Sequence, residues 1–245
     1  MTTGSDPFIH HPELRDKIAD PLRSSYRALD LKMLDEKMRA AGAAANWRYS
    51  DAKREETRQT ALDGRFTDDL WVFAYGSLIW EPAFRFSEVR TALLKGYRRS
   101  FCVMSELGRG TPELPGLMAG LDTGDECKGL AFRINAEFVE EESRLIWRRE
   151  MLMHVYASLF VPIETPLGDL EALAFVVDRS SDHYTPGLSL EKTAQYMATG
   201  VGIFGSSLTY LETLVEQCKT VGIEDRALFR LRDLARQMTQ ENSTA

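Results

Sequence analysis

The sequence predicts an α+β fold. The predicted elements run in the order strands, one helix, two further strands and then helices, without the regular strand–helix alternation of a doubly wound parallel sheet. The length of 245 residues corresponds to one large domain or one domain with an appendage. Hydrophobic residues make up 44% and charged residues 27%, which is ordinary globular usage.

Composition excludes several classes of partner and location. The net charge is −7 and no Lys/Arg-rich run occurs, so we expect no nucleic-acid partner. The longest charge-free stretch, residues 193–211, is interrupted by polar residues and glycines, so we expect no membrane span. Three widely spaced cysteines argue against a disulfide framework or a CxxC metal site. With no secretory signal visible, a cytoplasmic location is expected.

Residues 1–66 are expected to form a helical extension packed on a main domain of residues 67–240. Helical composition predicts one helix from Asp20 to Ala41 and a second from a Ser50 cap to Leu62, each followed by a glycine. A tail that binds a partner protein is the alternative interpretation of this region.

The main domain begins with a strand that starts at Leu70, whose large and β-branched residues predict burial on both faces. A turn at residues 123–125 is expected to separate two later strands, and a helix is expected over residues 137–151. The other predicted strands cover residues 100–107, 116–122, 127–135, 155–163 and 170–178. Three helices are predicted to end the chain, starting at Ser189, near Leu208 and at Asp225.

The turn after the first strand, Ala74–Leu78, is the first candidate site. Gly76 allows a sharp bend, and consecutive backbone N–H groups in such a bend suit a carboxylate. A plain turn at the end of a strand is the alternative. Ser77 does not lie in a G-x-S-x-G motif, which argues against a nucleophilic serine.

Glu150 is the second candidate. It lies eleven residues after Val139, nearly three full helical turns, and so extends the apolar stripe of Val139 and Ile146. A carboxylate on a buried face loses hydration and its pKa rises, which suits a general base or acid near neutral pH. A structural ion pair with a nearby arginine, for example Arg149, is the alternative.

Two further candidates are weaker. Arg109 lies between glycines in a loop and could hold a carboxylate, although a surface hairpin is an equal interpretation. Tyr210 could point its hydroxyl into a cleft or fill a core edge. The stretch Gly200–Gly205 matches G-x-G-x-x-G, but the predicted helix before it does not fit a dinucleotide site, so a flexible connection that lines a pocket is expected. None of the four histidines has metal-site spacing, so no metal is expected.

Several separate motifs together resemble the ChaC-type, glutathione-specific γ-glutamylcyclotransferases. The resemblance covers about residues 70–235. It rests on the order of these stretches: Trp71–Trp80, Arg99–Cys102, Arg109–Pro112, Gly129–Arg133, Trp147–Met151 and Gly205–Leu211.

The resemblance implies a mixed β-barrel with flanking helices and a cofactor-free enzyme without a metal. Its expected reaction cyclises the γ-glutamyl group of glutathione to 5-oxoproline and releases Cys-Gly. Glu150 corresponds to the family's catalytic glutamate, and Arg109 and Tyr210 become substrate contacts. The expected substrate-binding residues of the first strand and turn are Val72, Phe73, Ala74, Tyr75, Gly76, Ser77 and Leu78.

Two positions depart from the family's pattern, which has Gly in place of Ala74 and Asn in place of Ser207. Either change could alter the preference among γ-glutamyl substrates, and neither removes the expected base. A protein of a different class, which binds a γ-glutamyl ligand without catalysis, would use the same cavity. The sequence leaves the oligomeric state open.

Overall fold

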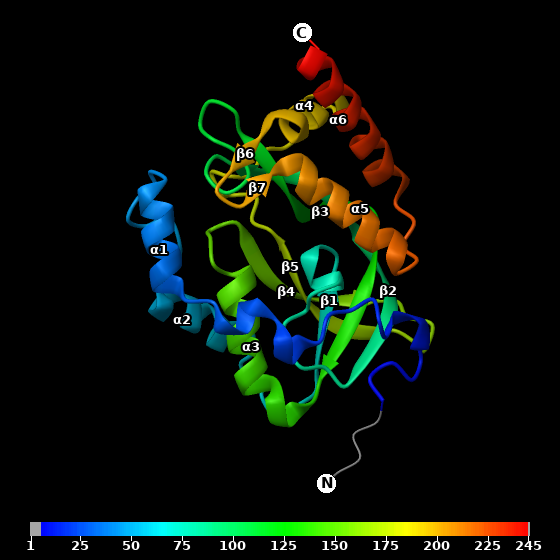
Figure 1. Cartoon of the computed structure of the whole chain (residues 1–245). Helices are drawn as coiled ribbons and strands as arrows, with labels where there is room; N and C mark the ends of the chain where they lie inside the picture. Colours follow the sequence, from blue (N-terminus) through cyan, green and yellow to red (C-terminus); the bar gives the residue numbers. More distant parts are fainter. Residues whose placement is uncertain (1–5, 245) are drawn as a thin grey trace. The chain divides into compact units, whose positions relative to one another are not determined.

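A five-stranded sheet organises the part of the chain that carries the first strand and its turn (Figure 1). The computed structural model describes residues 6–244 and divides the chain into two units. The first unit comprises residues up to 29 together with 46–98 and 123–178, and the second comprises 30–45, 99–122 and 179 onward. Two of the boundaries, after residues 98 and 122, fall within long strands, β2 (Glu88–Ser105) and β3 (Gly116–Ile134).

Strand β1 (Leu70–Ala74) lies inside the sheet, whose order is β2-β3-β1-β5-β4. It pairs antiparallel with β3 and parallel with β5 (Leu170–Val177), and β4 (Tyr156–Ile163) pairs antiparallel with β5. The side chains of Val72, Phe73 and Ala74 are fully buried, as the apolar run predicts for a strand covered on both faces. The sheet therefore holds the end of β1 firmly.

Helix α3 (Ala136–Glu150) packs on the first unit through one apolar face. Val139, Ile146 and Trp147 on this helix are buried, and the indole of Trp147 meets the ring of Phe175 on β5 edge to face, with 5.3 Å between ring centroids. This packing fixes the carboxyl-terminal end of α3, where Glu150 lies.

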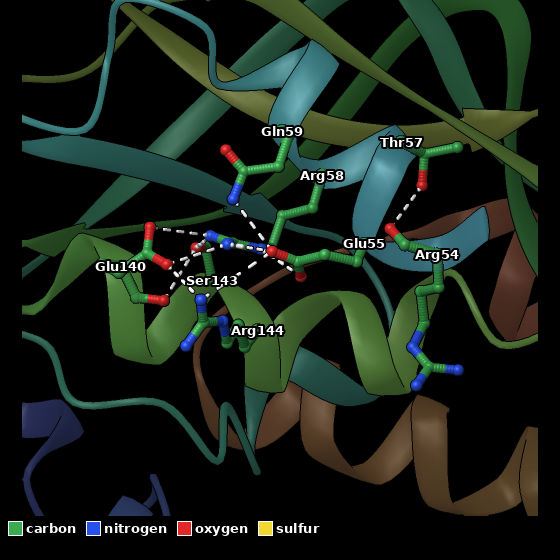
Figure 2. Close-up of polar contacts among 8 residues, drawn as sticks. All are labelled: Arg54, Glu55, Thr57, Arg58, Gln59, Glu140, Ser143 and Arg144. Atoms are coloured by element: carbon green, nitrogen blue, oxygen red, sulfur yellow. Dashed lines mark hydrogen bonds and ion pairs between the residues drawn. The ribbon is translucent and has the colours of Figure 1, made fainter. Parts of the chain in front are cut away.

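Helix α2 (Asp51–Ala61) lies beside α3 and begins at the predicted Ser50 cap, whose hydroxyl accepts a hydrogen bond from the Lys53 backbone N–H. Arg58 of α2 is completely buried. Its guanidinium donates hydrogen bonds to Glu55, Glu140 and Ser143, as Figure 2 shows. A buried cation with oxygen acceptors on three residues is satisfied, so this cluster joins the two helices.

The predicted continuous helix from Asp20 to Ala41 is wrong. The chain instead forms two short 3₁₀ turns, η2 (Pro21–Arg23) and η3 (Ser25–Ala28), and then α1 (Leu31–Ala40), which belongs to the second unit. The side chains of Asp20, Ser24 and Asp30 each accept a hydrogen bond from a backbone N–H two residues ahead. Such local bonds compete with the backbone hydrogen bonds of a continuous helix. The segment therefore forms three separate helical elements, each of which begins after one of these side chains. A further turn, η1 (Pro12–Leu14), precedes them.

The predicted turn at residues 123–125 is also wrong, because β3 continues through it. Within the first unit, a Cβ on Gly124 would lie 2.5 Å from the Cγ of Arg98, so the stem of Arg98 occupies the space that a side chain would need. This glycine marks close side-chain packing in a strand rather than a turn.

The second unit contains the predicted carboxyl-terminal helices: α4 (Leu190–Thr199), α5 (Ser207–Thr220) and α6 (Arg226–Thr244), which pack on one another (Figure 1). Their first residues follow the expected caps, since Ser189 and Asp225 accept hydrogen bonds from backbone N–H groups of α4 and α6.

The glycine-rich stretch between α4 and α5 is a small hairpin, β6 (Val201–Gly202) and β7 (Gly205–Ser206), rather than the flexible connection expected. Helix α4 precedes it, as predicted. A Cβ on Gly202 would lie 2.4 Å from the carbonyl oxygen of Leu107, so close packing against the backbone requires this glycine.

Two expectations concern the chain as a whole. No helix of residues 6–244 is both long and apolar enough to cross a membrane. The boundary between an extension of residues 1–66 and a main domain of residues 67–240 stays a prediction, and residues 1–5 of that extension lie outside the described residues.

Gly129 on β3 tests how tightly the end of β1 is held. A Cβ there would lie 2.3 Å from the carbonyl oxygen of Ala74 and 2.8 Å from the Phe73 ring. Gly129→Ala is expected to lower the free energy of unfolding by about 1–3 kcal/mol, the usual scale for overpacking, in urea denaturation. The control Lys128→Ala changes an exposed neighbour and should stay within about 0.5 kcal/mol. Equal unfolding free energies for Gly129→Ala and the unmodified protein would contradict the close contact.

Candidate active site

The turn that follows β1 exposes its backbone at one glycine. After Ala74 the chain bends at Gly76 into a 3₁₀ turn, η4 (Ser77–Ile79), and the Ile79 N–H donates a 2.9 Å hydrogen bond to the Gly76 carbonyl oxygen. A Cβ added at Gly76 would meet no other part of the described chain within 4 Å. A ligand could therefore approach the backbone of this turn closely.

The predicted binding stretch Val72–Leu78 contributes unequally to such a surface. The side chains of Val72, Phe73 and Ala74 are fully buried, and those of Tyr75 and Leu78 are nearly so. Gly76 and Ser77 are half-buried and are the accessible members of the stretch. The first strand thus supplies a scaffold, and the turn supplies the accessible groups.

Glu150 is the last residue of α3, and its side chain is only 16% exposed. Burial raises the pKa of its carboxyl above the ordinary value, while the positive charge of Arg149 lowers the pKa and offsets part of that rise. The helical spacing from Val139 and Ile146 predicted this half-buried position. A carboxyl group of this kind can take up and return a proton near neutral pH.

Arg149 connects Glu150 to the turn after β1. Its Nη2 donates a 2.7 Å hydrogen bond to the Ser77 hydroxyl, and its Nε lies 3.1 Å from a carboxylate oxygen of Glu150. A third bond runs from its Nη1 to the Glu81 backbone carbonyl. The guanidinium carbon also lies 4.0 Å from the centroid of the Tyr26 ring, in cation–π geometry. One side chain therefore holds the turn and the carboxylate in a common arrangement.

Both interpretations of Glu150 that the sequence left open have structural support. The ion pair with Arg149 exists, and the carboxyl group is poorly hydrated with a raised pKa. These features are compatible, because the charged neighbour favours the carboxylate while burial favours the protonated form.

Sequence reasoning missed the contribution of the amino-terminal segment to this site. Tyr26 stacks on Arg149, and the Ser24 hydroxyl donates a 2.7 Å hydrogen bond to the Glu81 carboxylate. The Ala19 N–H also donates to the Trp80 carbonyl oxygen. Tyr26 lies within the predicted helix from Asp20 to Ala41, which does not form, and no local pattern connects it to Arg149.

Arg109 and Tyr210 belong to the second unit, where they lie close together. The Arg109 guanidinium carbon is 5.2 Å from the centroid of the Tyr210 ring, and its Nη1 donates to the Phe204 carbonyl oxygen. Tyr210 also meets Phe101 edge to face at 6.0 Å. Their role in substrate binding stays a prediction.

The two departures from the family pattern are both buried. Ala74 has no exposed surface. The Ser207 hydroxyl donates a 3.0 Å hydrogen bond to the Arg109 carbonyl oxygen and accepts one from the Leu117 N–H at 3.1 Å. Ser207 therefore supports the loop that carries Arg109.

Within residues 6–244, no three His, Cys, Asp or Glu side chains gather in a way that could hold a metal ion.

Comparison with known proteins places this chain in a family. A profile of ChaC-like proteins matches residues 70–238. The chain is 32% identical over 174 residues to the glutathione-specific γ-glutamylcyclotransferase of Escherichia coli, which covers 71% of this chain and 75% of that protein. It is 30% identical over 158 residues to human glutathione-specific γ-glutamylcyclotransferase 1. The matching region covers 62% of this chain and 71% of the human protein.

Solved structures identify the fold. The crystal structure of yeast γ-glutamyl cyclotransferase specific to glutathione matches with a TM-score of 0.63 and 19% identity, over 71% of this chain and 98% of that one. The fold is therefore that of the γ-glutamylcyclotransferases, and the predicted α+β class with a barrel-like mixed sheet is confirmed. More narrowly, the chain belongs to the ChaC-like family.

The contact between Arg149 and Glu150 predicts a measurable shift. Removing the positive charge in Arg149→Gln should raise the pKa of the Glu150 carboxyl further, because only burial then acts on it. The pKa can be followed by NMR with carboxyl-labelled glutamate. The control Arg144→Gln removes a charge from an exposed position of the same helix and should leave the Glu150 pKa in place. A Glu150 pKa that is unchanged or lower in Arg149→Gln would contradict the arrangement.

Proposed function

We propose that the protein is a glutathione-specific γ-glutamylcyclotransferase, with Glu150 as the group that moves protons. The observation that carries the proposal is a poorly hydrated carboxyl joined through Arg149 to the turn after β1. Membership of the ChaC-like family supports it, as do relatives named for glutathione-specific γ-glutamylcyclotransferase activity.

The proposed reaction is internal to the substrate. The α-amine of the γ-glutamyl group attacks the side-chain carbonyl carbon, a new C–N bond closes the five-membered ring of 5-oxoproline, and the bond to the cysteinyl nitrogen breaks to release Cys-Gly. Because nucleophile and electrophile belong to one molecule, no covalent intermediate with the protein is needed. The protein must fold the substrate so that the reacting atoms meet, and this supplies much of the rate enhancement.

Glu150 balances the protons of this reaction. The substrate arrives as an ammonium ion, whose nitrogen cannot attack until it loses a proton, and the ionised carboxylate accepts that proton. The protonated carboxyl then gives the proton to the departing nitrogen. The ring nitrogen, which still carries two hydrogens after the attack, releases a second proton, and the freed amine of Cys-Gly takes up one from solvent, so Glu150 ends in its starting state. The raised pKa suits both steps, because a group that titrates closer to neutrality accepts and donates readily at working pH.

The turn after β1 is the proposed cradle for the γ-glutamyl end of the substrate. Gly76 leaves its backbone approachable, and Ser77 is held in place by Arg149. Backbone N–H groups in a bend suit the substrate's α-carboxylate. On the resemblance alone, Arg109 and Tyr210 are proposed as further substrate contacts.

Replacing the proposed base tests the mechanism. Glu150→Gln keeps the size of the side chain but cannot accept the proton, so turnover should fall by roughly two to four orders of magnitude while glutathione binding persists. Stopped assays of 5-oxoproline and calorimetric binding give the two quantities. Glu137→Gln, on the exposed first turn of the same helix, is the control and should retain full turnover. Turnover by Glu150→Gln at the unmodified rate would reject the assignment.

Substrate class is tested with glutathione, γ-Glu-Ala and γ-Glu-ε-Lys offered separately to the purified protein. We expect glutathione to give 5-oxoproline and Cys-Gly. The amount of 5-oxoproline from glutathione should be well above the amount formed from γ-Glu-Ala or γ-Glu-ε-Lys. Binding of glutathione without any 5-oxoproline would instead favour the non-catalytic γ-glutamyl-binding protein. Preference for γ-Glu-Ala or γ-Glu-ε-Lys would keep the reaction and overturn the specificity.

A further inference from the structure

A cavity lies in the first unit, and none of the proposed catalytic groups lines it. Its volume is about 430 Å³, and residues of η3, α2 and α3 line it. The lining includes four arginines and one tryptophan, which supply many hydrogen-bond donors: Arg27, Arg54, Arg144, Arg148 and Trp147. A cavity of this size is within the range of small-molecule sites.

Two arginines of the cavity lie on a different face of α3 from Glu150, whereas Trp147, three residues before Glu150, lies only about 60° around the helix from it. Arg144 and Arg148 lie four residues apart and share one helix face, and Arg148 is about 200° around the helix from Glu150 at 100° per residue. Arg27 and Arg54 lie before residue 70, outside the stretch that matches the ChaC-like profile. The cavity is therefore built partly from residues that the family match does not cover.

Three buried hydrogen-bond donors around this cavity have no partner. They are Nη1 of Arg54, Nε1 of Trp147 and Nε of Arg148, each without a hydrogen bond to any described residue. Trp147 is 1% exposed and Arg54 is 9% exposed, so water reaches neither side chain freely. Buried donors of this kind normally have an acceptor, and all three belong to residues that line one cavity.

The acidic residues of the lining are already engaged. Asp51 accepts hydrogen bonds from Arg48 and Arg54, and Glu55 accepts two from Arg58. Figure 2 shows the Arg54 guanidinium standing apart from the hydrogen-bond network of Arg58. The remaining acidic residue, Glu141, has a side chain that is 59% exposed and forms an ion pair with Arg27.

No carboxylate of residues 6–244 pairs with Arg148. Its Nη2 donates to the backbone carbonyl oxygens of Tyr26 and Arg27, at 3.0 and 2.9 Å. Burial and the positive charges of Arg54 and Arg27 lower the pKa of Arg148, although a guanidinium stays protonated at neutral pH. The electrostatic potential at this side chain is positive, and a bound anion would offset the repulsion among the three arginines.

We propose that this cavity binds a small organic anion through a phosphate or carboxylate group held by Arg54, Arg148 and the indole N–H of Trp147. All three groups are donors without acceptor capacity, which matches an oxyanion and no cation. Arginines bind such groups with paired, charge-assisted hydrogen bonds. The site is independent of glutathione cyclisation and holds even if that activity is rejected.

The test uses pyrophosphate and citrate as separate probes on the full chain, with sodium chloride at matched ionic strength. Isothermal titration calorimetry should give saturable binding of pyrophosphate if the site prefers phosphates, or of citrate if it prefers carboxylates. At saturation, thermal unfolding should shift upward by roughly 3 °C. Either preference supports the site, and the absence of binding by both probes overturns it.

Matched variants locate the binding. Trp147→Phe removes the indole N–H and makes the side chain smaller, but it keeps an aromatic ring against Phe175. Arg54→Gln removes a second buried donor, and each variant should weaken binding about ten-fold or more. Arg144→Gln removes one charge at the 59% exposed rim and should weaken binding by no more than about two-fold. If Trp147→Phe does not fold by circular dichroism, Arg54→Gln decides. An equal loss of binding affinity in Arg54→Gln and Arg144→Gln would show that the anion is attracted only by the overall positive charge, and it would overturn the proposal.

Discussion

The Arg149 guanidinium is the contact on which the catalytic geometry depends. It donates to the Ser77 hydroxyl and the Glu81 carbonyl oxygen, pairs with Glu150 and stacks on Tyr26. These partners come from three segments, so one planar cation sets the position of the turn, the helix end and the amino-terminal segment. A lysine could not make these bonds together, because its ammonium lacks the planar fork.

The same contact sets the electrostatic balance of Glu150. Burial favours the neutral carboxyl and Arg149 favours the carboxylate, so the folded-state pKa lies above the ordinary one but is restrained. Because the folded-state pKa exceeds the unfolded one, the contribution of Glu150 to stability is present in full below the unfolded pKa. It is lost as the pH rises through the folded-state pKa. A carboxyl prepared for proton transfer is thus maintained at some expense of stability at neutral pH.

Helical periodicity and capping residues were sufficient to predict much of this arrangement. The spacing from Val139 to Glu150 located the half-buried carboxyl, and Ser50 and Ser189 located two helix starts. The first failure was local. The break of the Asp20–Ala41 helix comes from side-chain bonds to the backbone that helix propensity does not weigh.

The second kind of failure concerned glycine and long-range partners. Gly124 resembles a turn residue in the sequence, but in the structure it makes room for the stem of Arg98 within a strand. The stacking of Tyr26 on Arg149 joins residues more than a hundred positions apart, and no periodic pattern reports such a pair. Local patterns therefore predicted the elements, and tertiary packing decided how the amino-terminal segment supports the site.

The most direct measurement of the central claim is a crystal structure of the Glu150→Gln protein with glutathione. The account predicts the substrate's α-amine within about 3 Å of the side chain at position 150, with the α-carboxylate against the backbone of Gly76 and Ser77. A γ-glutamyl group bound with its amine beside a different acidic residue, and position 150 out of reach, would contradict the account.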